Sequence, residues 1–118
     1  MSLPTRRRQT SDAAIRASAP IFAALGDDTR LRIVGRLSAD GPASIARLTV
    51  GTDVTRQAVT KHLHVLSEVG LVRGRHVGRE NVWELQRQQL YQARQSLDAI
   101  AMQWDRALGR LKAFIEHE

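Results

Sequence analysis

The segment between Thr55 and Gly70 constrains the fold of this 118-residue chain more than any other. Threonine commonly caps the start of a helix and glycine commonly ends one, so this pair predicts a helix over residues 56–69. At about 100° per residue, the apolar side chains of this helix gather on one side. They are Ala58, Val59, Leu63, Leu66 and Val69. The segment therefore offers one face to a core and leaves the other for polar side chains.

The polar face of this helix carries side chains that can donate hydrogen bonds to phosphates or to base edges. Its members are Arg56 at the leading end, then Gln57, Thr60, Lys61 and His64. A short helix capped by Ser44 and a turn over residues 51–54 precede it. This order favours a helix-turn-helix motif, whose second helix enters the major groove of DNA. The alternative is an ordinary amphipathic surface helix. His62 falls on the inward side and is interpreted as a structural histidine with a hydrogen-bond partner.

Two short β-prone runs after Gly70 enclose a tight turn at residues 78–80, which predicts a β-hairpin. Its basic side chains are Arg73, Arg75, His76 and Arg79. Cations on a two-stranded tip suit a wing that reaches phosphates or the adjacent minor groove. The alternative is a solvated hairpin whose edge is protected by charge, and Glu80 and Glu84 can pair with some of the arginines. Trp83 is expected to pack under the hairpin.

Upstream of the polar-faced helix the chain predicts three shorter helices, the second of them starting at an aspartate-rich cap over residues 27–29. We expect its inward stripe to comprise Leu31, Val34 and Leu37. The helix is expected to end before Asp40, because Gly41 and Pro42 follow it.

From about Arg87 to the end the chain lacks proline, which predicts one long helix over about residues 87–116. Apolar side chains recur every seven residues in two adjacent rows, Leu90, Leu97, Trp104 and Leu111 beside Ala93, Ile100, Ala107 and Phe114. The stripe is wider than the rest of so small a chain is expected to cover. We therefore expect a homodimer with an interface at Leu90, Leu97, Ile100, Trp104 and Leu111. The alternative is that the helix packs only on the first helix of its own chain.

Together these elements predict an α+β, mostly helical fold. It comprises a winged helix-turn-helix domain over residues 12–118, including the final helix, and a flexible basic arm over residues 1–11. The formal charge is +6, and 16 of the 18 cations are arginine, which favours a polyanionic partner such as double-stranded DNA. No apolar run is long enough to span a membrane and no secretory signal is recognisable, so we expect a cytoplasmic protein. No phosphate loop, carboxylate pair or nucleophile–base spacing appears, so no enzyme is expected.

Several stretches of the sequence resemble ArsR/SmtB-type repressors over roughly residues 18–115. They are residues 22–33, residues 57–66 followed by Gly70-Leu71-Val72, and the tip Gly78-Arg79 with Trp83-Glu84-Leu85 behind it. The resemblance implies a dimeric repressor that binds an operator near its own promoter and releases it on a signal. It also implies DNA reading by Arg56, Gln57, Thr60, Lys61 and His64, and wing contacts by Arg75 and Arg79. The family usually has proline where Asp28 stands, and either residue fits a helix start.

Many members of that family sense metals, but the ligands of the known site types are missing. One type needs two cysteines in the helix near residues 45–50, and this chain has no cysteine. Another uses aspartate and histidine on the last helix, which here carries Asp98, Asp105 and His117 without an Asp-x-His pair. We expect no metal site and no cofactor. The signal is then a small organic molecule, a protein partner or protein concentration. The alternative function is a winged helix that contacts proteins without sequence-specific DNA binding.

Overall fold

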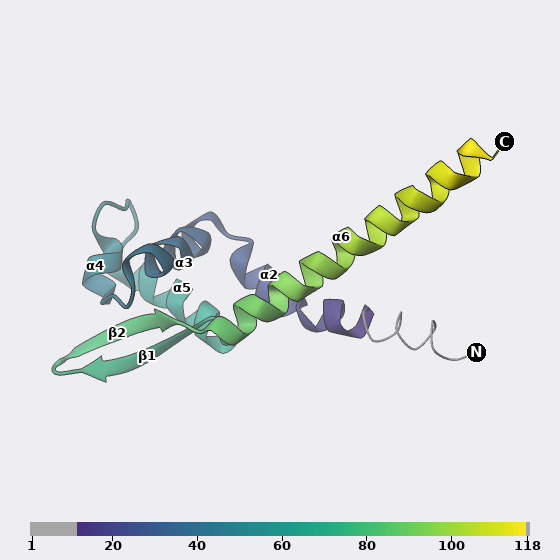
Figure 1. Cartoon of the computed structure of the whole chain (residues 1–118). Helices are drawn as coiled ribbons and strands as arrows, with labels where there is room; N and C mark the ends of the chain where they lie inside the picture. The colour runs from purple at the N-terminus through teal and green to yellow at the C-terminus, as the bar shows by residue number, and fades with distance from the viewer. Residues whose placement is uncertain (1–11, 118) are drawn as a thin grey trace. The chain divides into compact units, whose positions relative to one another are not determined.

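A computed structural model describes residues 12–117, so the basic arm expected over residues 1–11 lies outside the described residues. The chain forms two compact units (Figure 1). Among the described residues, one unit comprises residues 20–90, and the other comprises residues 12–19 together with residues 91–117. The first unit contains the helix-turn-helix and the hairpin, and the second contains most of the long final helix.

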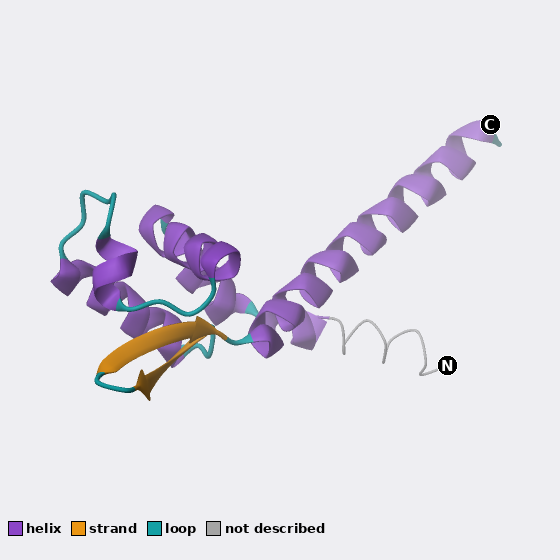
Figure 2. Cartoon of the chain, turned by 60° about the vertical axis from the view of Figure 1, so that its left-hand side comes forward, coloured by secondary structure: helices purple, strands orange, loops and turns teal. Residues whose placement is uncertain are grey.

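In the first unit, helices and a two-stranded hairpin follow one another in the predicted order (Figures 1 and 2). They are α2 (Ala19–Leu25), α3 (Asp28–Asp40), α4 (Ile45–Thr49), α5 (Arg56–Glu68), β1 (Val72–Val77) and β2 (Glu80–Leu85). All of them contribute to the core except β2, whose side chains are half-buried or exposed. The buried apolar side chains include Ile21, Leu37, Leu48, Val59, Leu63, Leu66, Leu71 and Val72. The predicted α+β, mostly helical winged helix-turn-helix is confirmed.

Helix α3 begins at the cap predicted for it, with Asp27 as the capping residue. It runs through Asp40, one residue beyond the predicted end, and stops at Gly41, whose φ is +83°. Its predicted inward stripe is wrong at one position. Val34 and Leu37 are buried, but Leu31 is 56% exposed and Ile33 is buried instead. Leu31 lies about 200° around the helix from Ile33, so only one of the two can face the core.

Both caps predicted for the helix-turn-helix are confirmed. Ser44 Oγ accepts a hydrogen bond from the Arg47 backbone N–H at 3.2 Å. Thr55 Oγ1 accepts one from the Ala58 backbone N–H at 3.1 Å. Each cap satisfies one of the N–H groups that the first turn of a helix leaves without an internal partner. The two caps therefore fix where α4 and α5 begin.

Helix α5 ends in a Schellman motif at Gly70, whose φ of +79° lies in the left-handed region that favours glycine. The Gly70 N–H donates to the Ser67 carbonyl oxygen, and the Leu71 N–H donates to the Leu66 carbonyl oxygen, both at 3.0 Å. Leu66 and Leu71 are both fully buried. Helix α5 is therefore joined to the hairpin through a short, hydrogen-bonded link.

The hairpin pairs β1 and β2 in an antiparallel register that places Val77 opposite Glu80. This leaves a two-residue loop, Gly78-Arg79, in which only Gly78 has a positive φ, of +63°. Such a loop fits a type II′ turn. Strand β2 also pairs with a residue outside the hairpin. The Trp83 N–H donates to the Ala43 carbonyl oxygen at 2.8 Å, and the Ala43 N–H donates to the Trp83 carbonyl oxygen at 3.0 Å. The segment before α4 is thus tied to β2.

The final helix α6 (Arg87–Glu116) is unbroken, as the sequence predicted. Within the second unit, residues 12–17 are also helical. A buried pair of hydroxyls joins the two segments: the Oγ atoms of Ser18 and Ser96 lie 2.6 Å apart. Both side chains are buried, and each hydroxyl is also within 3.5 Å of the Ala14 carbonyl oxygen. Among the helices of residues 12–117, none is long and apolar enough to cross a membrane.

Candidate nucleic-acid interface

The polar face of α5 is exposed as the helical spacing predicted. Its exposed members are Arg56, Gln57, Lys61 and His64. The fifth candidate, Thr60, is half-buried, and its hydroxyl donates to the Arg56 carbonyl oxygen at 2.8 Å. The Thr60 oxygen can still accept a hydrogen bond, but its proton is engaged within the helix. We define the donor face as Arg56, Gln57, Thr60, Lys61 and His64.

His64, the last member of the donor face along α5, lies next to the hairpin. Its ring centroid is 6.2 Å from that of Trp83, with the planes tilted by 49°. Trp83 packs under the hairpin as expected, because its ring covers Gly74 on β1: a Cβ built on Gly74 would lie 3.3 Å from ring atoms of Trp83. The contact makes the donor face continuous with the base of the hairpin.

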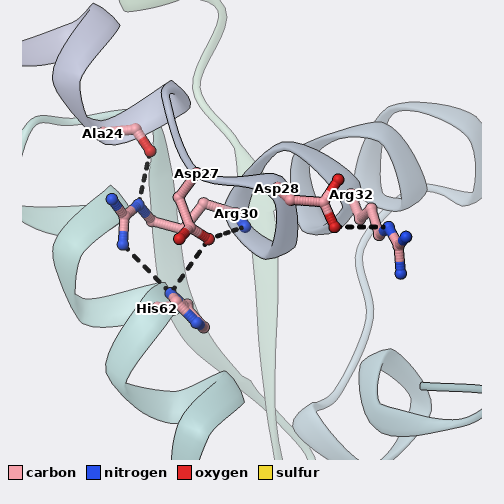
Figure 3. A network of polar contacts seen from close by, with 6 residues as sticks. All are labelled: Ala24, Asp27, Asp28, Arg30, Arg32 and His62. Carbon is pink, nitrogen blue, oxygen red and sulfur yellow. Dashed lines mark hydrogen bonds and ion pairs between the residues drawn. The ribbon is translucent and has the colours of Figure 1, made fainter. Parts of the chain in front are cut away.

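The start of α3 is fastened to both α2 and α5 through Arg30 (Figure 3). The Arg30 Nε donates to the Ala24 carbonyl oxygen at 2.6 Å, and its Nη1 lies 3.3 Å from His62 Nδ1. Because a guanidinium only donates, His62 Nδ1 is the acceptor in this pair. The interpretation of His62 as a structural histidine with a hydrogen-bond partner is confirmed. The sequence did not identify Arg30 as that partner.

Asp27 lies in the same cluster, where its carboxylate caps α3 and also lies near His62 of α5. Its Oδ2 accepts a hydrogen bond from the Arg30 backbone N–H at 3.0 Å and lies 3.9 Å from His62 Nδ1. The hydrogen bond from the Arg30 N–H holds the pKa of the Asp27 carboxyl below its ordinary value of 3.8. Partial burial acts in the opposite direction, and the charge of Arg30 reinforces the lowering of this pKa. The cap of α3 is therefore a carboxylate at neutral pH.

The turn between α4 and α5 is held by Arg36, which sequence analysis did not single out. Its Nη1 donates to the carbonyl oxygens of Leu48 and Val50, each at 2.8 Å, and its Nη2 donates to that of Arg47 at 3.1 Å. These carbonyl groups lie at the end of α4, where a helix leaves acceptors without internal partners. Arg36 therefore links α3 to the turn that precedes the donor face.

The two wing residues implied by the resemblance lie on the exposed part of the hairpin. Arg75 is on β1, and Arg79 is in the two-residue turn. Arg75 is already paired, because its Nε lies 3.3 Å from Glu84 Oε2. The other carboxylate oxygen of Glu84 accepts a hydrogen bond from Arg73 Nη2 at 2.8 Å. The expectation that arginines of the hairpin pair with Glu84 is confirmed.

The electrostatic effect of these pairs is visible at Glu84. The hydrogen bond from Arg73 holds the pKa of the Glu84 carboxyl below its ordinary value of 4.5, and the charges of Arg75 and Arg73 add to this. Partial burial opposes the shift. The hairpin therefore presents a carboxylate, together with its arginines, at neutral pH. Within residues 12–117, no ion pair is formed by Glu80.

No three side chains of histidine, cysteine, aspartate or glutamate come together as metal ligands in the described part of the chain. Asp98 is 4.0 Å from Arg94 at an exposed position of α6, where it forms a surface ion pair. The donor face of α5 and the hairpin offer hydrogen-bond donors and positive charge.

Comparison with known proteins gives three consistent findings. A helix-turn-helix domain family matches residues 25–75. The chain is 39% identical over 95 residues to the HTH-type transcriptional regulator Rv2034 of Mycobacterium tuberculosis, covering 80% of this chain and 85% of that protein. The fold is similar to that of an ArsR-like transcriptional regulator from Rhodococcus sp. RHA1, with a TM-score of 0.73 and 35% identity over 84% of this chain and 92% of that one.

A more distant likeness concerns a Mycobacterium bovis protein described as a homodimeric winged helix-turn-helix DNA-binding domain and a possible ArsR-family regulator. The TM-score is 0.58 at 22% identity, over 84% of this chain and 88% of that one. At this identity the likeness supports the fold alone.

Proposed function

Because this chain belongs to the ArsR family of winged helix-turn-helix transcriptional regulators, it regulates transcription by binding DNA, and we propose that it does so as a homodimeric repressor of its own or an adjacent operon. The donor face of α5 carries this proposal. It combines amide, ammonium, guanidinium and imidazole groups on one exposed side of a helix whose other side is buried. Such groups distinguish base pairs at their major-groove edges.

The exposed apolar side of α6 supports the homodimer. Four of the five residues predicted for the interface are more than 40% exposed, and these are Leu97, Ile100, Trp104 and Leu111. The fifth, Leu90, is half-buried. Large apolar side chains in two heptad rows are typical of a helix that packs on a partner helix. A two-fold dimer would place two α5 helices about 34–36 Å apart, in successive major grooves.

We further propose that the signal releasing this repressor is not a metal ion. The chain has no cysteine, and its last helix lacks the paired aspartate and histidine of the known metal site. The remaining effectors are a small organic molecule, a protein partner or the concentration of the protein itself. Action on chromosomal DNA would place the protein in the cytoplasm.

Selection of binding sites from random duplexes tests the proposal, followed by a search for the selected motif upstream of the gene itself. We expect a two-fold symmetric motif. The selected duplex is then titrated with a chelator and with added zinc, and we expect affinities to agree within about twofold. Selection without enrichment of any motif would favour the protein-contact alternative. Release from DNA that a chelator reverses would contradict the metal-independent signal.

Two variants then separate base reading from phosphate binding. Gln57→Ala is expected to relax base preference at one position of each half-site, because a good base contact discriminates by about 1–3 kcal/mol. Arg79→Ala is expected to weaken selected and scrambled duplexes alike. It should also lower the slope of affinity against salt by about one unit for each phosphate that the variant no longer binds. The assignment is wrong if Arg79→Ala changes the selected motif while Gln57→Ala leaves it intact.

A further inference from the structure

Glu84 lies at the centre of the cationic face of the hairpin. In the antiparallel register it stands opposite Arg73, and Arg75 lies two residues further along the same face. One carboxylate oxygen accepts a hydrogen bond from Arg73 at 2.8 Å, and the other lies 3.3 Å from Arg75 Nε. Two of the three arginines of the hairpin therefore share a single counter-charge.

The three side chains differ in how far they can move. The side chain of Glu84 is only 19% exposed, whereas those of Arg73 and Arg75 are 64% and 51% exposed. Ion pairs with so exposed a partner are weak, so the guanidinium groups can leave the carboxylate. The carboxylate is more confined by its surroundings and stays near the strand. The negative charge is thus fixed, and the positive charges are movable.

This arrangement matters when a phosphate approaches the hairpin. An arginine that turns toward the phosphate either shares its donors with Glu84 or leaves the carboxylate close to a second negative group. Both outcomes reduce the free energy gained by the phosphate contact, because like charges repel and because a hairpin with less net positive charge neutralises less phosphate charge and so releases fewer counterions. The reduction does not depend on base sequence.

We propose that Glu84 limits the affinity of the hairpin for the phosphate backbone and so keeps the sequence-independent part of DNA binding low. The inference rests on the proposed function, because it requires the hairpin to lie against DNA. Glu84 acts here through Arg73 and Arg75 and does not itself contact a base. Removing its charge should therefore strengthen binding to any duplex.

The test compares Glu84→Gln with the unaltered full-length protein, titrated on a duplex of random sequence and on the selected duplex at several salt concentrations. Glutamine keeps an oxygen that can accept from Arg73 but lacks the charge. We expect affinity to rise about threefold per wing, and by the same factor on both duplexes. The slope against salt should become steeper. Unchanged or weaker binding by Glu84→Gln would overturn the inference.

Two further variants make the outcome specific. Glu80→Gln removes the same charge from a side chain that has no ion-pair partner among the described residues, and it is expected to have less than half the effect. An equal gain in affinity would mean that the total charge of the protein sets the effect and that the ion pairs with Arg73 and Arg75 do not.

Arg75→Ala tests whether the hairpin contacts DNA at all. If Arg75→Ala weakens DNA binding while Glu84→Gln changes nothing, the inference about Glu84 fails and the proposed wing contact stands. If neither variant changes the affinity for DNA, the inference and the proposed wing contact both fail.

Discussion

At the scale of single residues, several arginines of this basic chain serve the protein's own structure. Arg30 joins α3 to α2 and α5, and Arg36 joins α3 to the end of α4. Arg32 forms only an exposed pair with Asp28 at 3.2 Å (Figure 3), and such pairs contribute little to stability. The count of 18 cations therefore overstates the number that are free to meet DNA.

The lowered pKa of Asp27 makes a pH-dependent contribution to stability. Because the folded-state pKa lies below the ordinary value of 3.8, the contribution is fully present above that pH and is lost as the pH falls through the folded-state value. Asp27→Asn keeps a good capping side chain but cannot titrate. We expect the free energy of unfolding of the variant to fall less steeply below pH 3.8 than that of the unaltered protein, as measured by urea unfolding across a pH series. Parallel pH profiles would contradict this expectation.

Local residue roles could be predicted from the sequence, and roles that depend on distant partners could not. The caps Ser44 and Thr55 act on N–H groups three residues away, so the sequence itself carries the signal. Arg36 acts on carbonyl groups 11 to 14 positions away. Which carbonyl groups it meets depends on how α3 lies against α4, and no spacing along the chain encodes that.

At the scale of elements, the hairpin depends on contacts from outside it. Only Val72 of its strands is fully buried, and an isolated two-stranded hairpin is at best marginally stable. Trp83 connects the hairpin to the rest of the unit through its backbone pairing with Ala43 and its ring contact with His64, and its ring also covers Gly74 within the hairpin. The hairpin was predictable from its turn and β-prone runs. Its attachment to Ala43 was not, because the two partners are forty residues apart.

Trp83→Ala tests this support. We expect a loss of about 2 kcal/mol in the free energy of unfolding, below the range for a fully buried aromatic residue because Trp83 is half-buried. Affinity for DNA should fall, while the base preference of α5 should persist. Thermal or urea unfolding and duplex titration measure the two effects. Val77→Ala, at an exposed position near the far end of the same hairpin, is the control and should change stability by only a few tenths of a kcal/mol. A similarly small loss for Trp83→Ala would show that the hairpin holds its position without the ring.

At the scale of the whole molecule, the second unit has too little chain to cover its own helix. The apolar rows of α6 were predictable from heptad spacing, but whether the chain itself would cover them was not. Among residues 12–117 this side remains exposed over the last part of α6, at Trp104, Leu108, Leu111 and Phe114. An exposed apolar stripe of this kind marks an interaction surface.

Changing Leu97 and Trp104 together to glutamate should abolish the proposed homodimer, because it places charge in one heptad row. Sedimentation should then show monomers, and affinity for the selected duplex should fall because each complex would engage only one half-site. Met102→Glu is the matched control. Met102 is also exposed, but it lies on the opposite side of α6 from Ile100 and Trp104, so this variant should remain dimeric. An intact dimer of the double variant would place the interface elsewhere.

The Schellman link at Gly70 has a consequence for how such regulators diverge after gene duplication. If the donor face reads bases as proposed, substitutions at Arg56, Gln57 or Lys61 would change the preferred bases without moving the hairpin, because α5 passes into β1 through a link anchored by Leu66 and Leu71. An inserted residue at this link would instead displace two buried leucines and shift the hairpin relative to α5. Duplicated copies would then acquire new operators base by base, while the position of the hairpin relative to α5 is inherited unchanged.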